Sequence, residues 1–115
     1  IDRRPEGKLL GGLWEFPGGK REKGETLQAC LRRELREELG ITVGVGRGVG
    51  VFDHAYTHFR VTVYAFECMI RKGEPRAIES DEIRWVAPRE LAGYPMGKVD
   101  RAISRLLMEG SRKTR

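Results

Sequence analysis

The stretch of sequence that decides the fold covers residues 19–41 and reads GKREKGETLQACLRRELREELGI. It predicts a helix over residues 26–39, because leucine recurs at every fourth position and forms one apolar stripe along a helix. Thr26 is a suitable N-cap, and Gly40 stands where a glycine commonly ends a helix. From Ile41 onwards the sequence changes to the β-branched residues typical of strands. A loop, one amphipathic helix and a following strand are therefore the elements that this stretch predicts.

Three glutamates share one face of this predicted helix. Glu34, Glu37 and Glu38 stand at positions i, i+3 and i+4, so a turn of about 3.6 residues brings them together roughly opposite the leucines. Carboxylates this close repel one another unless solvent and arginines, or a hard divalent cation, compensate their charge. Oxygen-rich sites with few protein ligands suit Mg²⁺ or Mn²⁺, which keep several waters and share phosphate oxygens. Taken alone, the triplet is explained more simply as a charged, solvated helix face.

The spacing around these glutamates resembles the Nudix box. The sequence reads Gly19, five residues, Glu25, seven residues, Arg33-Glu34-Leu35, one residue, Glu37-Glu38, one residue and Gly40-Ile41. Agreement at so many fixed positions is very rare by chance. The flanks extend the resemblance to MutT-type Nudix hydrolases over nearly the whole chain, through Leu13 to Lys20, Trp85 and Tyr94-Pro95.

Beyond this box, the sequence predicts strands on both sides of the helix and a second helix near the end. Residues 42–53 and 56–70 are rich in β-branched and aromatic types, and residues 82–87 form a shorter strand pattern around Trp85. Asp100 is placed to cap the final amphipathic helix. This order indicates the α+β or α/β class, with a mixed sheet and helices on its faces.

The resemblance implies a Nudix-type α/β/α sandwich with a mixed central sheet. We expect one domain over residues 1–110, and the length of the chain also favours a single domain. The family's first strand would precede Ile1, so we expect that strand to be missing here. Residues 111–115 are expected to form a basic tail.

Composition and charge exclude some classes of protein. No apolar run approaches the roughly 20 residues that a membrane-spanning helix needs, so we expect no membrane partner. Most of the formal net charge of +5 lies in residues 101–115, which hold five basic residues and one acidic residue. This end either contacts DNA or is a solvated terminus. Cys30 and Cys68 are expected to be buried free thiols, which indicates a reducing, cytoplasmic compartment.

The resemblance also implies a reaction and its residues. Nudix enzymes hydrolyse nucleoside diphosphates linked to another group, and water activated near Mg²⁺ attacks one phosphorus of the pyrophosphate. The metal would be bound by three glutamates and one backbone carbonyl, namely those of Glu34, Glu37, Glu38 and Gly19. Arg33 and Glu25 would hold the preceding loop and the helix together. Independently of the family, such a metal ion neutralises a pyrophosphate and lowers the pKa of the attacking water.

Three more residues are implied in catalysis or substrate binding. Glu79 lies where MutT-like enzymes place a further acid near the metal, although Asp81 and Glu82 are rival choices and a solvated loop acid is an equal alternative. Phe16 would line the nucleobase pocket. Arg4 resembles a nucleotide contact of the same subfamily, and an exposed arginine without such a role is an equally good interpretation.

Asp100 falls where MutT-like enzymes often have an asparagine that reads 8-oxoguanine. An ionised aspartate only accepts hydrogen bonds, so this difference leaves the base open. The segment from Asp53 to Phe59 resembles a pattern in the C-terminal, MutT-like domain of the adenine DNA glycosylase MutY, which inspects 8-oxoguanine in DNA. If the MutT-like register holds, Thr57 and His58 would lie beside the same base pocket as Asp100.

Two functions from different classes therefore stay open. The intact box favours a Mg²⁺-dependent, MutT-like nucleotide pyrophosphohydrolase that clears 8-oxo-dGTP. The histidine-containing segment, the missing first strand and the basic tail favour the lesion-recognition domain of a MutY-like A/G-specific adenine glycosylase, with DNA as its partner. A Nudix enzyme for another substrate, such as a nucleotide sugar, is a third alternative. The sequence does not indicate the oligomeric state.

Overall fold

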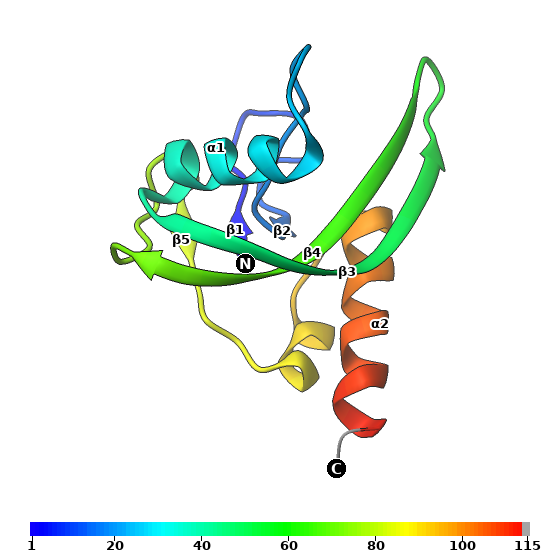
Figure 1. Ribbon diagram of the computed structural model, residues 1–115. Helices are drawn as coiled ribbons and strands as arrows, with labels where there is room; N and C mark the ends of the chain where they lie inside the picture. The colour runs from blue at the N-terminus through cyan, green and yellow to red at the C-terminus, as the bar shows by residue number, and fades with distance from the viewer. Residues whose placement is uncertain (114–115) are drawn as a thin grey trace.

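The computed structural model of the protein describes residues 1–113, with side chains described as far as Gly110. Its elements are, in chain order, β1 (Asp2–Arg3), β2 (Trp14–Glu15), α1 (Leu27–Leu39), β3 (Thr42–Ala55), β4 (Arg60–Lys72), β5 (Glu82–Ile83), the 3₁₀ helix η1 (Pro88–Gly93) and α2 (Lys98–Lys113). Figure 1 shows a long twisted hairpin of β3 and β4, with α1 and α2 packed along different parts of it. This order of strands and helices agrees with the α+β or α/β prediction.

The short strands form one sheet and the long hairpin forms another. β1 lies between β2 and β5, and both pairings are antiparallel. β3 and β4 pair antiparallel along their length, beginning with Thr42 opposite Lys72. A parallel bridge between Trp14 and Met96 gives the arrangement its mixed character.

α1 begins and ends at the residues that its sequence predicts. The Thr26 hydroxyl accepts a hydrogen bond of 3.0 Å from the Ala29 N–H at the start of the helix. At the other end Gly40 adopts a left-handed conformation with a φ of 72°, and its N–H donates to the Arg36 carbonyl. This left-handed backbone conformation favours glycine at position 40. The predicted helix and both of its caps are thus confirmed.

The core joins α1 to β3. Leu35 and Leu39 of the helix pack on Ile41 and Val43 of the chain that follows, and all four side chains are buried. The partly buried residues around this cluster are Leu31, Val45, Ile70 and Ile83. Burial of one such side chain stabilises a fold by roughly 1.5–3 kcal/mol. The cluster therefore fixes which face of α1 is left free for chemistry.

α2 contacts β3 farther along the hairpin. A Cβ added at Gly50 of β3 would lie 3.2 Å from Leu106 Cδ2, so the close approach of α2 favours glycine there. α2 continues to Lys113, so the domain boundary predicted at residue 110 falls inside this helix. Residues 114–115 of the predicted tail lie outside the described residues. In the part of the chain that is described, neither α1 nor α2 has the length and apolar composition needed to cross a membrane.

Two predicted strands are shorter in the structure. The aromatic run from Tyr56 to Phe59 belongs to the turn between β3 and β4, where the Tyr56 N–H donates to the Phe59 carbonyl at 2.7 Å. Their rings stack with centroids 4.8 Å apart, which favours the turn over continued strand. Trp85 lies beyond β5 and is 81% exposed. The prediction of a strand over residues 82–87 was therefore wrong for residues 84–87.

The two cysteines differ in their surroundings. Both are free thiols, as predicted, but Cys30 is buried and Cys68 is exposed. Cys68 stands in β4 between Glu67 and Met69, which are exposed as well, so this stretch of the strand lies outside the described core. The prediction that Cys68 is buried was wrong.

Candidate active site

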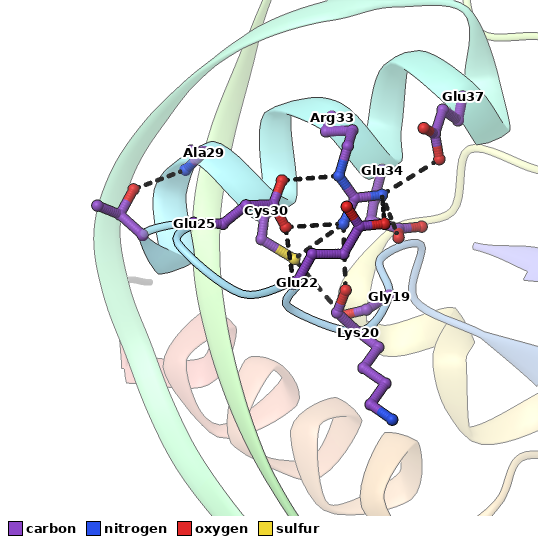
Figure 2. Close-up of polar contacts among 10 residues, drawn as sticks. Gly19, Lys20, Glu22, Glu25, Ala29, Cys30, Arg33, Glu34 and Glu37 are labelled. Atoms are coloured by element: carbon purple, nitrogen blue, oxygen red, sulfur yellow. Dashed lines mark hydrogen bonds and ion pairs between the residues drawn. The ribbon is translucent and has the colours of Figure 1, made fainter.

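Arg33 ties the loop before α1 to the helix, as Figure 2 shows. Its Nε donates to Glu25 Oε2 at 2.7 Å, and its Nη2 donates to the other oxygen of the same carboxylate at 2.9 Å. Nη2 also donates to the Lys20 carbonyl at 3.1 Å. Hydrogen bonding by Arg33, assisted by the Glu22 N–H, lowers the pKa of Glu25 to about 2. Such bidentate, charge-assisted pairs are among the strongest side-chain contacts, so this one anchors an otherwise exposed loop.

The same guanidinium orients the glutamates of the helix unequally. Nη1 of Arg33 donates to Glu34 Oε1 at 2.8 Å and lies 3.3 Å from Glu37 Oε2. The side chain of Glu34 is 16% exposed, whereas that of Glu37 is 52% exposed. A Cβ added at Gly19 would overlap the Glu34 carboxyl group, so this carboxylate packs directly against the Gly19 backbone. Glu34 therefore faces the loop, and Glu37 lies nearer the solvent.

Glu38 reaches the same loop from the next turn of α1. Its Oε2 accepts a hydrogen bond of 2.9 Å from the Gly18 N–H. Burial raises the pKa of Glu38 to about 8, and the charges of Asp2, Glu34 and Glu15 raise it as well, against the lowering effect of the Gly18 hydrogen bond. A carboxylate in such surroundings ionises at neutral pH only if a positive partner is close.

Glu38 is part of the wall of an acidic cavity of about 400 Å³. The charged residues that line this cavity are the acids Asp2, Glu15, Glu38 and Glu79 and the bases Arg4 and Lys8. Pro5, Leu39 and Ser80 complete the wall. Acidic side chains thus outnumber basic ones around a space that suits a hydrated cation and phosphate groups.

Asp2 is a residue of this cavity that the sequence analysis missed. In the antiparallel pairing of β1 with β2 it stands directly opposite Glu15, and it is only 5% exposed. Burial raises the pKa of Asp2 to about 7, and the charge and hydrogen bond of Glu15 raise it further. Asp2 therefore keeps its proton up to near-neutral pH, hydrogen-bonded to Glu15. In the sequence Asp2 is only a polar residue beside two arginines, and the strand register is the signal that identifies it.

The donors at the end of the loop have the chemistry that a hard divalent cation requires. Glu34, Glu38 and the Gly19 backbone supply oxygen atoms, and the surplus of carboxylates favours added positive charge. Within the described residues no group of three or more acidic, histidine or cysteine side chains already converges on one point. Glu34 and Glu37 instead form ion pairs with Arg33. The residues fit a cation whose binding competes with these hydrogen bonds.

The structure separates the three acids that were expected near the metal. Glu79 lines the cavity together with Glu38, whereas Asp81 and Glu82 bond other parts of the chain. The Ile78 N–H donates to the Glu38 carbonyl at 3.2 Å, so the segment that carries Glu79 is attached to the end of α1. The catalytic role of Glu79 stays a prediction.

The residues expected to contact the base are only partly brought together. Asp100 is not an N-cap, because α2 already begins at Lys98 and includes Asp100 in its first turn, so that prediction was wrong. Its Oδ1 instead accepts a hydrogen bond of 3.1 Å from the Phe16 N–H. Burial raises the pKa of Asp100, against the lowering effect of this bond. The turn between β3 and β4 lies at one end of the long hairpin (Figure 1), and Thr57 is an exposed residue of this turn. Among the described residues, no hydrogen bond or ion pair joins Thr57 to Phe16 or Asp100.

A comparison with protein families identifies the fold. Residues 1–106 match the family model described as the NUDIX domain. The chain belongs to the Nudix family. Its helix α1 and the loop before it, which carry the paired Glu25 and Arg33, correspond to the Nudix box quoted above.

Individual relatives agree with this assignment. The chain is 36% identical over 100 residues to the CTP pyrophosphohydrolase of Escherichia coli (strain K12), which covers 87% of this chain and 74% of that protein. It is 34% identical over 110 residues to the 8-oxo-dGTP diphosphatase of Haemophilus influenzae, covering 95% of this chain and 81% of that protein. The crystal structure of the MutT protein from Methanosarcina mazei Go1 superposes with a TM-score of 0.81 at 25% identity, covering 99% of this chain and 83% of that chain.

These similarities confirm the MutT-like resemblance and the α/β/α sandwich that it implied. The protein is a Nudix hydrolase of the MutT type, in a family whose members hydrolyse nucleoside diphosphate derivatives and generally use divalent metal ions. The named relatives are nucleotide hydrolases, which favours the enzyme over the MutY-like DNA-binding alternative.

The first prediction concerns Arg33. Replacing it in Arg33→Ala removes both bonds to Glu25 and the bond to Glu34, so the melting temperature should fall by several degrees and kcat/KM by about tenfold or more. Arg33→Lys keeps the charge but not the bidentate geometry, and should be intermediate. Thermal melts and rates are compared with those of Arg32→Ala, an exposed arginine on the same helix. Parent-like stability and turnover in Arg33→Ala would contradict the assignment.

The second prediction concerns the buried carboxyl pair. The pKa of Asp2 is about 7 in the folded protein, against 3.8 for an ordinary aspartate. At a pH between these two values, the folded state therefore holds a proton that the unfolded state has lost. Stability therefore falls as pH rises through this window. Asp2→Asn removes the effect, and its melting temperature should exceed that of the parent by several degrees at pH 8 but hardly at pH 4, in metal-free buffer.

The matched control for this experiment is Asp53→Asn, which changes an exposed aspartate of β3. It should melt like the parent at both pH values. An Asp2→Asn variant whose advantage over the parent does not grow with pH would show that Asp2 is ionised normally.

Proposed function

We propose that the protein is a Mg²⁺-dependent nucleotide pyrophosphohydrolase that acts on 8-oxo-dGTP, with Mn²⁺ as an alternative cation. The observation that carries the proposal is the contact of Glu34 and Glu38 with the backbone of Gly18 and Gly19 beside an acidic cavity. The names of two relatives, an 8-oxo-dGTP diphosphatase and a MutT protein, support the substrate class. A nucleotide substrate and two free thiols fit the predicted cytoplasmic location.

The proposed metal ligands come from one loop and one helix. They are the Gly19 carbonyl and the carboxylates of Glu34, Glu37 and Glu38. When bound, the cation neutralises the pyrophosphate and lowers the pKa of the attacking water. Arg33 keeps Glu34 turned toward the loop through their 2.8 Å bond, and Glu25 in turn holds Arg33. Glu37 is the least buried of the three glutamates and is proposed to contribute from the solvent side.

Glu79 is the residue proposed to move a proton. It lines the same cavity as Glu38, and from there its carboxylate can accept the proton that the attacking water loses.

Phe16 and Asp100 are proposed to contact the base. The bond from the Phe16 N–H to Asp100 Oδ1 holds the two residues together and leaves Oδ2 to accept from a base. Guanine offers its N1–H and exocyclic amine, and 8-oxoguanine also offers an N7–H. Arg4 is proposed to contact the nucleotide with the part of its guanidinium that is not bonded to Glu15 and the Leu9 carbonyl. Cytosine also has an exocyclic amine, so CTP is a second candidate substrate, which the name of the Escherichia coli relative supports.

The third prediction tests the metal site. Glu38→Gln removes one anionic ligand at nearly constant volume, so hydrolysis of 8-oxo-dGTP with Mg²⁺ should fall roughly a thousandfold while the protein stays folded. The control is Glu74→Gln, an exposed carboxylate that does not line the cavity and should be as active as the parent. Rates and circular dichroism are measured on the same samples. Undiminished hydrolysis by Glu38→Gln, or in excess chelator, would overturn the metal assignment.

The fourth prediction separates the hydrolase from the DNA-binding alternative. The parent should release pyrophosphate from 8-oxo-dGTP and bind 8-oxo-dGMP without DNA, and removing residues 111–115 should leave both unchanged. Affinity for a duplex containing 8-oxoguanine should be weak. A lesion-recognition module would instead bind that duplex with an affinity that falls as salt rises, because phosphate contacts release counterions. No pyrophosphate release, together with such salt-sensitive binding, would replace the proposed function by the alternative.

A further inference from the structure

The loop between β1 and β2 has a closed and well-defined shape. The Gly12 N–H donates to the Arg4 carbonyl and the Gly11 N–H donates to the Lys8 carbonyl, both at 2.9 Å. Arg4 Nε donates to the Leu9 carbonyl at 2.8 Å from the other side. A Cβ added at Gly11 would lie 2.7 Å from the Pro5 carbonyl oxygen and 3.0 Å from that of Lys8, so the turn closes only around glycine. The backbone that carries Lys8 is therefore preorganised.

Lys8 is the available positive charge of the acidic cavity. Arg4, the other basic residue of the wall, donates from Nη1 to Glu15 at 3.0 Å, so its charge is largely neutralised. The Lys8 side chain is exposed and lines the cavity, and in the part of the chain that is described it forms no ion pair. A preorganised loop thus places, on the wall of the acidic cavity, a lysine that has no ion-pair partner among the described residues.

Lys8 lies on the side of the site that carries the proposed catalytic acids. It shares the cavity with Glu38 and Glu79, whereas Phe16 and Asp100, the proposed base contacts, are not among the residues that line it. Beside the proposed metal ligand Glu38 and the proposed proton acceptor Glu79, a positive charge would be placed to contact the phosphates of a bound nucleotide. Lysine is well suited to this role, because its ammonium is a compact charge with three donors on a flexible stem.

We propose that Lys8 binds the phosphate chain of the substrate and sets the preference for nucleoside triphosphates over shorter phosphate esters; this inference rests on the proposed function. The substrate brings several negative charges to a wall that already holds four carboxylates. A divalent cation offsets only part of this charge, and Lys8 supplies a further positive group. Its contribution therefore grows with the number of phosphates and is independent of the base.

The test measures binding, so that turnover is not needed to read it. Calorimetric titrations with Mg²⁺ compare α,β-methylene-dGTP, which resists hydrolysis, with dGMP. Lys8→Gln should weaken binding of the triphosphate analogue about tenfold, the size expected for one charge-assisted contact, and change dGMP binding by less than about twofold. Lys8→Arg should restore most of the affinity. Lys23→Gln, which changes an exposed lysine of another loop, should leave both affinities unchanged.

The same parent protein is assayed for hydrolysis of 8-oxo-dGTP, where Lys8→Gln should raise KM about tenfold with kcat nearly unchanged. A parent that binds and hydrolyses triphosphates while Lys8→Gln binds the analogue equally well would overturn this role alone. Equal weakening of the triphosphate and of dGMP would also overturn it, since it would indicate a contact to the nucleoside or its α-phosphate, which both ligands share. A parent that neither binds the analogue nor hydrolyses a nucleotide would overturn the proposed function itself.

Discussion

The bidentate bond between Arg33 and Glu25 is the contact on which the candidate site depends. The core fixes α1 through Leu35 and Leu39, but the loop before the helix is largely exposed and contributes no residue to that core. Arg33, only 21% exposed, reaches from the helix to both Glu25 and the Lys20 carbonyl and so gives the loop its position. The approach of Gly18 and Gly19 to the glutamates of α1 follows from this attachment, because the two glycines precede the anchored residues by only a few positions.

The second constraint is an excess of negative charge. Burial is the largest cause that raises the pKa of Glu38 to about 8 and that of Asp2 to about 7. Neighbouring acidic side chains contribute to both shifts. Such a cluster lowers the stability of the protein when no cation is bound. A cation that binds there therefore stabilises the folded state. The basic side chains in and around the cavity have different partners. Arg33 orients the glutamates from outside the cavity, Arg4 neutralises Glu15, and Lys8 is left for the substrate.

The sequence predicted what depends on local spacing and missed what depends on pairing between distant segments. The helix and both of its caps follow from short-range sequence patterns, and the structure confirms them. Asp2 entered the site only because a two-residue strand pairs it with Glu15. The choice of Glu79 over its neighbours required a hydrogen bond to the end of α1. Strand register and strand length are set by partners that no local pattern reveals.

The central proposal is that Glu34, Glu37, Glu38 and the Gly19 carbonyl bind a divalent cation at the end of the anchored loop. The most direct measurement is anomalous diffraction at the manganese edge from crystals of the protein grown with Mn²⁺. The account predicts a peak within about 2.5 Å of oxygen atoms from these residues, with Glu34 turned at least partly away from Arg33. A peak held only by other residues, or no peak at a Mn²⁺ concentration that supports hydrolysis, would contradict it.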